Sequence, residues 1–181
     1  MSTALIIIDV QNDYFPNGRC ELVQSEQALA ATQKLLAYFR LNNMPIYFVQ
    51  HISAPTATFF LPDSDGVQIH PGIDPQPCEQ VICKHTPNSF YNTDLHAKLQ
   101  QISVQELIIC GMMTHMCVDT TVRAAKDLGY AITLISDACA TKNLEWDGHS
   151  IAASTVQSVY LASLNGAFAN ILTSTGYLAQ L

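Results

Sequence analysis

Six short apolar runs, rich in branched residues, recur along the chain, and each is too short to be a buried helix. The runs lack polar alternation, which is typical of strands covered on both faces, as in a parallel sheet between helices. We therefore predict strands at residues 4–8, 45–49, 80–83, 106–110, 131–135 and 168–172.

Apolar residues at helical spacing predict a helix in most of the segments between these runs. Ser25 is a candidate N-cap for the first helix, and Gly129 suits the left-handed cap at the end of the third. Alternating strands and helices predict a doubly wound α/β fold, formed by a single domain over residues 1–181. The predicted helices cover residues 25–41, 93–102, 118–128 and, from 146 or 147, up to 164.

The segment from His51 to Cys78 interrupts this alternation. It contains five prolines, two glycines and a cluster of aromatic residues, and it is too long for an ordinary connection. Long ordered loops in compact domains are usually functional, with a passive surface excursion or an oligomer contact as the alternative.

The 181 residues are 49% hydrophobic and only 13% charged, against the ~25% charged residues of an average domain. The net charge is −7 and no basic run occurs, so we expect no binding to nucleic acid or to anionic membranes. No apolar stretch reaches the ~18 residues of a membrane span. The six cysteines form no CxxC pair, and no basic region precedes the first apolar run, which predicts free thiols and a cytoplasmic location.

Three reactive side chains follow predicted strands. Asp9 ends the first strand, Lys84 ends the third, and the fourth runs into GMMTHMC, which places Cys117 at the start of the next helix. Ligands of open α/β sheets bind beyond the carboxyl ends of the strands, so we expect these groups to converge. Asp9 or Cys117 alone has an ordinary structural explanation, whereas the combination predicts a catalytic site.

A thiol at a helix N-terminus and close to a lysine is expected to have a low pKa and to be a thiolate nucleophile. Asp9 would move a proton between the thiol, a leaving amine and the attacking water, while Lys84 orients Asp9. Backbone N–H groups in the turn from Gly111 to Cys117 would stabilise an oxyanion.

The blocks IIIDVQNDYF, VICKHTPNSFYNTDL and LIICGMMTHMCVDTTVRAAKDLGY contain these residues. Together they resemble the isochorismatase-like cysteine hydrolases, which include nicotinamidases, carbamoylsarcosine amidases and streptothricin hydrolase-like amidases. The resemblance spans nearly the whole chain. It implies a three-layer sandwich with a six-stranded parallel sheet, an Asp9-Lys84-Cys117 triad, hydrolysis through a thioester, no cofactor, and a homodimer or homotetramer. It also implies a cis peptide between Met112 and Met113, which aims the Met113 N–H, with that of Cys117, at the oxyanion.

Nicotinamidases of this family bind a metal through an Asp-x-His motif after the second strand. The corresponding stretch here reads VQHISAP, with Gln50 where a carboxylate is wanted. His51, His70 and His85 lack a recognisable ligand spacing. We therefore expect no metal, and this departure also counts against nicotinamide as the substrate.

Several side chains near the triad are candidates for a substrate pocket, although each is about as well suited to core packing. Thr114 and Asp119 are expected to hold the turn and the helix start. Trp146 would pack in the core or reach the active site of a neighbouring subunit. The pocket candidates are Phe15, Phe59, Phe60, Phe90, Tyr91 and His115.

The leading function is a cysteine hydrolase that cleaves an amide or related C–N bond of a small molecule through a thioester acyl-enzyme. One alternative is isochorismatase-type hydrolysis of a vinyl ether. Another is a catalytically silent binding or scaffold protein, against which the intact Asp9, Lys84 and Cys117 count. A nucleotide-binding Rossmann protein ranks lowest, since neither GxGxxG nor GxxxxGK[ST] occurs.

Overall fold

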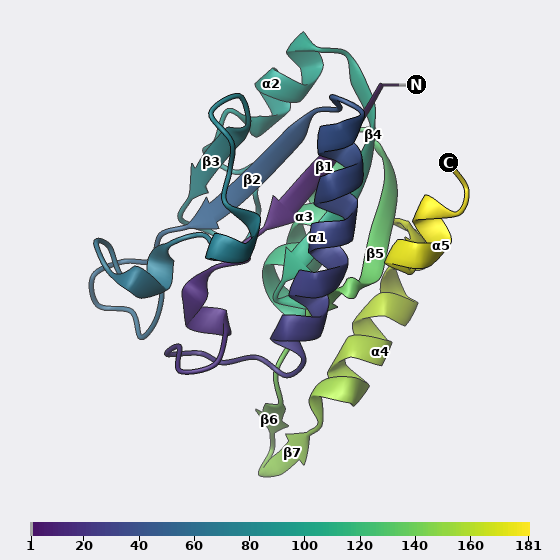
Figure 1. Ribbon diagram of the computed structural model, residues 1–181. Coiled ribbons are helices and arrows are strands. Elements are labelled where there is room, and N and C mark those ends of the chain that lie inside the picture. The colour runs from purple at the N-terminus through teal and green to yellow at the C-terminus, as the bar shows by residue number, and fades with distance from the viewer. Residues whose placement is uncertain (1) are drawn as a thin grey trace.

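The computed structural model describes residues 2–181 and contains a central six-stranded parallel sheet (Figure 1). The strand order β3-β2-β1-β4-β5-β8 places the first strand in the middle, with later strands added toward either edge. This topology confirms the predicted doubly wound α/β fold. The strands are β1 (Ser2–Ile8), β2 (Ile46–His51), β3 (Gln80–Lys84), β4 (Val104–Met112), β5 (Ala131–Ala140) and β8 (Asn170–Leu172).

Helices cover both faces of the sheet, which completes the three layers (Figure 1). Helices α1 (Ser25–Leu41) and α5 (Ser174–Leu178) pack on one face. On the other face lie α2 (Leu95–Gln101), α3 (Asp119–Asp127) and α4 (Ala153–Leu164).

Strand β1 shows why its sequence is apolar without interruption. Its side chains at Leu5 and Ile7 enter the core beneath α1, while Ile6 and Ile8 enter the core on the opposite face. All four are at most 1% exposed, as the covering of both faces requires.

The fourth predicted helix is wrong at its start. Helix α4 begins at Ala153, and the residues before it form the hairpin β6 (Leu144–Trp146) and β7 (His149–Ile151) at the bottom of Figure 1. Asp147 and Gly148 both have positive φ, as a tight two-residue turn requires. Trp146 is 77% exposed on this hairpin, so it does not pack in the core.

Smaller differences concern the ends of helices. Ser25 is the first residue of α1, but no side-chain hydrogen bond caps that helix; its N-cap is Gln24, in the left-handed region. Gly129 follows α3 with φ +91°, which agrees with its predicted role. A π-helical turn, η4 (Thr114–Val118), precedes α3 and contains Cys117.

The long segment between β2 and β3 lies beside the carboxyl ends of these strands and carries two short 3-10 helices (Figure 1). They are η2 (Asp65–Val67) and η3 (Pro71–Ile73), and a third, η1 (Asn12–Tyr14), follows β1. Across residues 2–181, no helix is both long and apolar enough to cross a membrane.

Gly111 makes the close approach of β1 and β4 possible. Its φ is +128°, and a Cβ at this position would collide with the carbonyl oxygen of Ile8. The register pairs Ile8 with Gly111, immediately before Asp9 on one strand and the η4 turn on the other.

We expect Gly111→Ala to lower the free energy of unfolding by about 3 kcal/mol or more, because the new methyl group meets backbone and φ becomes strained. Gly148→Ala is the control: its φ is +74°, but nothing lies within 4 Å, so only the backbone cost of about 1 kcal/mol applies. Urea unfolding monitored by circular dichroism measures both, and equal losses would contradict the steric argument.

Candidate active site

Asp9, Lys84 and Cys117 meet at the carboxyl edge of the sheet, as the sequence predicts for their position. The Lys84 Nζ lies 2.8 Å from the Asp9 Oδ2, and both side chains are 0% exposed. The buried Cys117 sulfur lies within 4.8 Å of an Asp9 carboxylate oxygen, and the charges of Asp9 and Lys84 both act on this thiol. The structure therefore assembles a closed acid, amine and thiol cluster from three separate elements.

The backbone sets the position of each member. Asp9 follows β1 in the left-handed region with φ 52°, and its N–H donates to the carbonyl oxygen of Val49 on β2. Lys84 is the last residue of β3 and is in register with His51 on β2. The β1, β2 and β3 edge thus brings the carboxylate and the ammonium together across one intervening strand.

The Lys84 ammonium is surrounded by acceptors. Besides Asp9, it lies 3.2 Å from the carbonyl oxygen of Thr86, 3.3 Å from that of Pro87 and 3.4 Å from the Nδ1 of His51. Burial lowers the pKa of Lys84, but the negative charge of Asp9 opposes this effect and the pKa is raised. Lys84 is therefore a permanent cation within the site.

The pKa of Cys117 is shifted in the opposite direction to the one that the sequence predicts. Burial, followed by the negative charge of Asp9, raises the pKa of the thiol, and the attraction of Lys84 offsets only part of this. The expected low-pKa thiolate is therefore wrong for the resting site. The raised pKa favours the neutral Cys117 thiol, beside a carboxylate that is placed to accept its proton.

The turn that carries Cys117 is held from both sides. The Thr114 hydroxyl donates to the Ala140 carbonyl oxygen at 3.2 Å. Asp119 accepts from Arg123 at 2.9 to 3.0 Å, one turn further along α3. These contacts agree with the structural roles predicted for Thr114 and Asp119. The Met112–Met113 peptide bond in this turn is cis.

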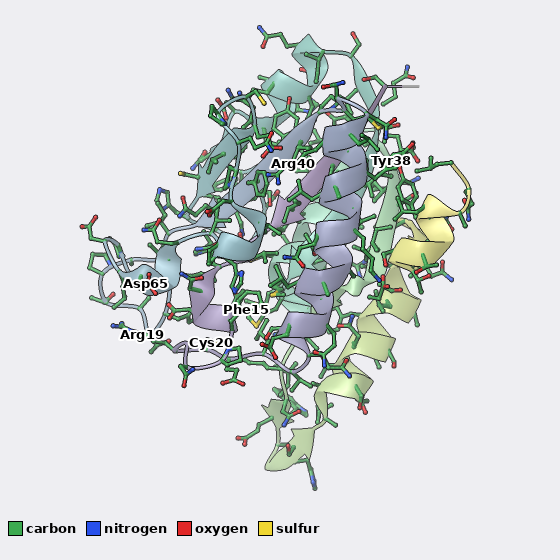
Figure 2. The ribbon with its side chains drawn as sticks, in the orientation of Figure 1. Phe15, Arg19, Cys20, Tyr38, Arg40 and Asp65 are labelled. Carbon is green, nitrogen blue, oxygen red and sulfur yellow. The ribbon has the colours of Figure 1, made fainter. Side chains whose placement is uncertain are left out.

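Three of the predicted pocket aromatics belong to the loops beside the site. Phe59 and Phe60 pack on Tyr14, with ring centroids 5.7 and 4.6 Å away. Phe15 packs on His70 at 4.2 Å, and Figure 2 shows it next to the lower end of α1. Phe15 and Phe60 are nearly fully buried, so both contribute core packing, and a substrate contact remains a prediction.

The other pocket candidates lie differently. Phe90 stacks on Tyr130, which directly precedes β5, and it also contacts His96 on α2. Core packing therefore explains Phe90. Tyr91 is 57% exposed. His115 is part of the η4 turn, and its Nδ1 lies 2.6 Å from the Thr141 hydroxyl.

Sequence reasoning missed Gln11, which positions the end of β2. The side-chain amide of Gln11 donates to the carbonyl oxygens of His51 and Val67 at 2.9 and 2.7 Å, and its oxygen accepts from the His51 N–H at 2.8 Å. One buried side chain therefore joins the end of β2 to the long loop. The available signal was an amide residue two positions after Asp9, close to the end of a buried strand.

Asp13 was also missed, and it anchors the aromatic part of the same loop. Its carboxylate accepts from the Phe60 N–H at 2.6 Å and from the Arg19 N–H at 3.1 Å. Gly66 packs so closely that a Cβ would collide with this carboxylate. The run that follows Asp9 thus ties several points of the long loop to the site.

The donor set for a metal is limited. Asp9, His51 and Cys117 offer three ligand atoms within 4.8 Å of one another. The Lys84 ammonium, however, lies against both Asp9 and His51, and its positive charge would oppose a divalent cation there. The Nδ1 atoms of His70 and His85 contact the Gly72 N–H and the Ile52 carbonyl oxygen. We therefore assign no metal to this cluster.

Comparison with known proteins identifies the family. The isochorismatase domain profile matches residues 3–170. The chain is 47% identical to the uncharacterized isochorismatase family protein YddQ of Bacillus subtilis (strain 168), over 98% of this chain and 99% of that protein. It is 34% identical to a streptothricin hydrolase of Streptomyces noursei, over 78% of this chain and 50% of that protein.

A solved structure of similar length gives the same result. The crystal structure of an isochorismatase from Pseudomonas putida KT2440 has a TM-score of 0.92 and 37% sequence identity, covering 96% of this chain and 89% of that one. The protein therefore belongs to the isochorismatase family of hydrolases, which confirms the resemblance found in the sequence.

The Cys117 environment predicts opposite effects of two substitutions on thiol ionisation. Asp9→Asn removes the negative charge that raises the Cys117 pKa, so the midpoint of its alkylation by iodoacetamide moves to lower pH. Lys84→Ala removes the charge that lowers this pKa, so the midpoint moves to higher pH. Peptide mass spectrometry measures both, with exposed Cys78 and Cys83 as internal controls. Shifts of the same sign would contradict this electrostatic description.

We expect Asp13→Ala to loosen the loop, because the buried Phe60 N–H and the Arg19 N–H lose their acceptor. The free energy of unfolding should fall by about 2 kcal/mol or more, and the Phe60 amide should exchange faster with deuterium. Asp65→Ala is the matched control, because Asp65 accepts from the Asn12 side chain through its backbone carbonyl, which the substitution retains. Unchanged exchange at Phe60 in Asp13→Ala would show that the carboxylate does not hold the loop.

Proposed function

We propose that this protein hydrolyses an amide or related C–N bond of a small, uncharged molecule through a thioester on Cys117. One observation carries the proposal: a thiol, a carboxylate and an ammonium from three distant parts of the sequence lie together and are almost fully buried. Burying an ion pair is costly in free energy. A silent scaffold would gain nothing from retaining it beside a thiol.

Asp9 acts as the base in the first step. Its carboxylate takes the proton of the Cys117 thiol as sulfur attacks the carbonyl carbon, and the carbonyl electron pair moves to oxygen. Lys84 stabilises the negative charge while it passes from Asp9 to sulfur. The backbone N–H groups of Met113 and Cys117 are the proposed donors to the oxyanion.

Collapse of this intermediate breaks the C–N bond, and protonated Asp9 gives its proton to the leaving nitrogen. Asp9 then takes a proton from water while the water oxygen attacks the thioester carbon. The C–S bond breaks, the acid product leaves, and sulfur recovers its proton from Asp9. The cycle is balanced without a cofactor.

The distribution of charge supports an uncharged substrate. Asp9 and Lys84 neutralise each other, and the Cys117 thiol is neutral. Three of the other basic side chains form ion pairs, whereas Lys142 forms none within residues 2–181 and its charge acts on His115 in the η4 turn. Arg40 pairs with Glu79, Arg123 pairs with Asp119, and Lys98 pairs with Asp94. Figure 2 places Arg19 and Arg40 away from each other, on a loop tip and on α1.

This balance also disfavours the vinyl-ether alternative. Isochorismate carries two carboxylates, and their binding calls for unpaired cations near the nucleophile. The streptothricin hydrolase relationship instead supports hydrolysis of an amide bond.

Among compounds of similar size, we expect uncharged amides and carbamoyl compounds to be hydrolysed and their dicarboxylate analogues, including isochorismate, to be rejected. Cys117→Ala should reduce turnover at least about 10³-fold, because the thioester cannot form. Acid-quenched samples analysed by mass spectrometry should show acylated Cys117 in the wild type. Full turnover by Cys117→Ala, or cleavage of isochorismate alone, would refute the proposal.

A further inference from the structure

His51 faces the catalytic cluster, although neither the proposed mechanism nor the family assignment uses it. It is the last residue of β2 and the register partner of Lys84 on β3. The Gln11 side chain holds its N–H and its carbonyl oxygen. These contacts involve only the backbone of His51 and leave its imidazole available for the cluster.

The imidazole contacts the cluster directly. Its Nδ1 is 3.4 Å from the Lys84 Nζ, and one ring nitrogen lies within 4.8 Å of both an Asp9 carboxylate oxygen and the Cys117 sulfur. The ring of Phe60 lies 6.0 Å away, between centroids. The charged or titratable groups facing the ring are Asp9, Lys84, His85 and Cys117.

The direction of the Lys84 hydrogen bond defines the protonation state. An ammonium can only donate, so Nδ1 accepts and the ring proton is on Nε2. Burial lowers the pKa of His51 and outweighs the opposite effect of Asp9, so the neutral ring is favoured. A protonated ring would lose the acceptor and place a second cation beside the ammonium.

We infer that His51 is a positioning residue: its neutral imidazole accepts from Lys84 at Nδ1 and keeps the ammonium between the Asp9 carboxylate and the Cys117 sulfur. Without this acceptor, the ammonium is held away from the thiol by the carbonyl oxygens of Thr86 and Pro87, which lie at similar distances. Lys84 then stabilises the Cys117 thiolate less well. The inference rests on the proposed function, in which that thiolate forms.

The test measures the pH dependence of Cys117 alkylation, which needs no substrate. In His51→Leu the acceptor is lost, and we expect alkylation at pH 7 to slow about tenfold with its midpoint at higher pH. In His51→Asn the side-chain oxygen takes the place of Nδ1, and the rate should return to within about twofold of the wild type. His51→Gln, whose carbonyl reaches the Nε2 position instead, should behave like His51→Leu.

His85→Leu is the matched control, because this neighbouring histidine contacts the Ile52 carbonyl rather than the triad; it should leave the profile unchanged. Circular dichroism checks that each variant is folded, and the Asn and Gln comparison suffices if His51→Leu does not fold. A wild-type profile in folded His51→Leu, or equal profiles for the Asn and Gln variants, would overturn the inference.

Lys84→Ala separates this inference from the proposed function. If Lys84→Ala raises the alkylation midpoint while the His51 variants do not, only the positioning role of His51 fails. If Lys84→Ala leaves Cys117 unaffected, the coupling of Lys84 to the thiol fails, and the proposed function fails with it.

Discussion

The buried ion pair between Asp9 and Lys84 is the interaction on which the site depends. Asp9 follows β1 and Lys84 ends β3, with β2 between these two strands, and both side chains are inaccessible to solvent. A desolvated pair is stable only with close geometry and further hydrogen bonds, which the Lys84 contacts to two loop carbonyls and His51 provide. The same two charges act in opposite directions on the Cys117 pKa, so the pair also influences the ionisation of this thiol.

The segment after β1 links this pair to the loop that encloses it. Asp9 belongs to the cluster with Lys84 and Cys117, Gln11 holds the end of β2, and Asp13 holds the backbone at Phe60. In this short segment, every second residue from Asp9 to Asp13 therefore either belongs to the cluster or holds the surrounding backbone in place. Because these supporting groups are buried, the loop is positioned by hydrogen bonds that are costly to break.

The sheet and the approach of Asp9, Lys84 and Cys117 could be predicted because apolar runs and strand ends are local properties of the sequence. The hairpin before α4 was missed because helical spacing was extended through Asp147 and Gly148, although this pair is itself a turn signal. The pKa of Cys117 could not be predicted from its neighbours in sequence. It depends on burial and on Asp9, both of which are known only after folding. The same holds for the stacking of Phe90 on Tyr130.

The most direct test of the account is the ionisation of Cys117 in the resting protein, followed through the ¹³Cβ chemical shift of selectively labelled cysteine, with Cys117→Ser used for assignment. The account predicts a neutral thiol at pH 7, with ionisation only at a pH well above the ~8.5 of a free cysteine. A Cys117 signal that is already that of a thiolate at pH 6 would contradict it, since Asp9 would then have no proton to remove.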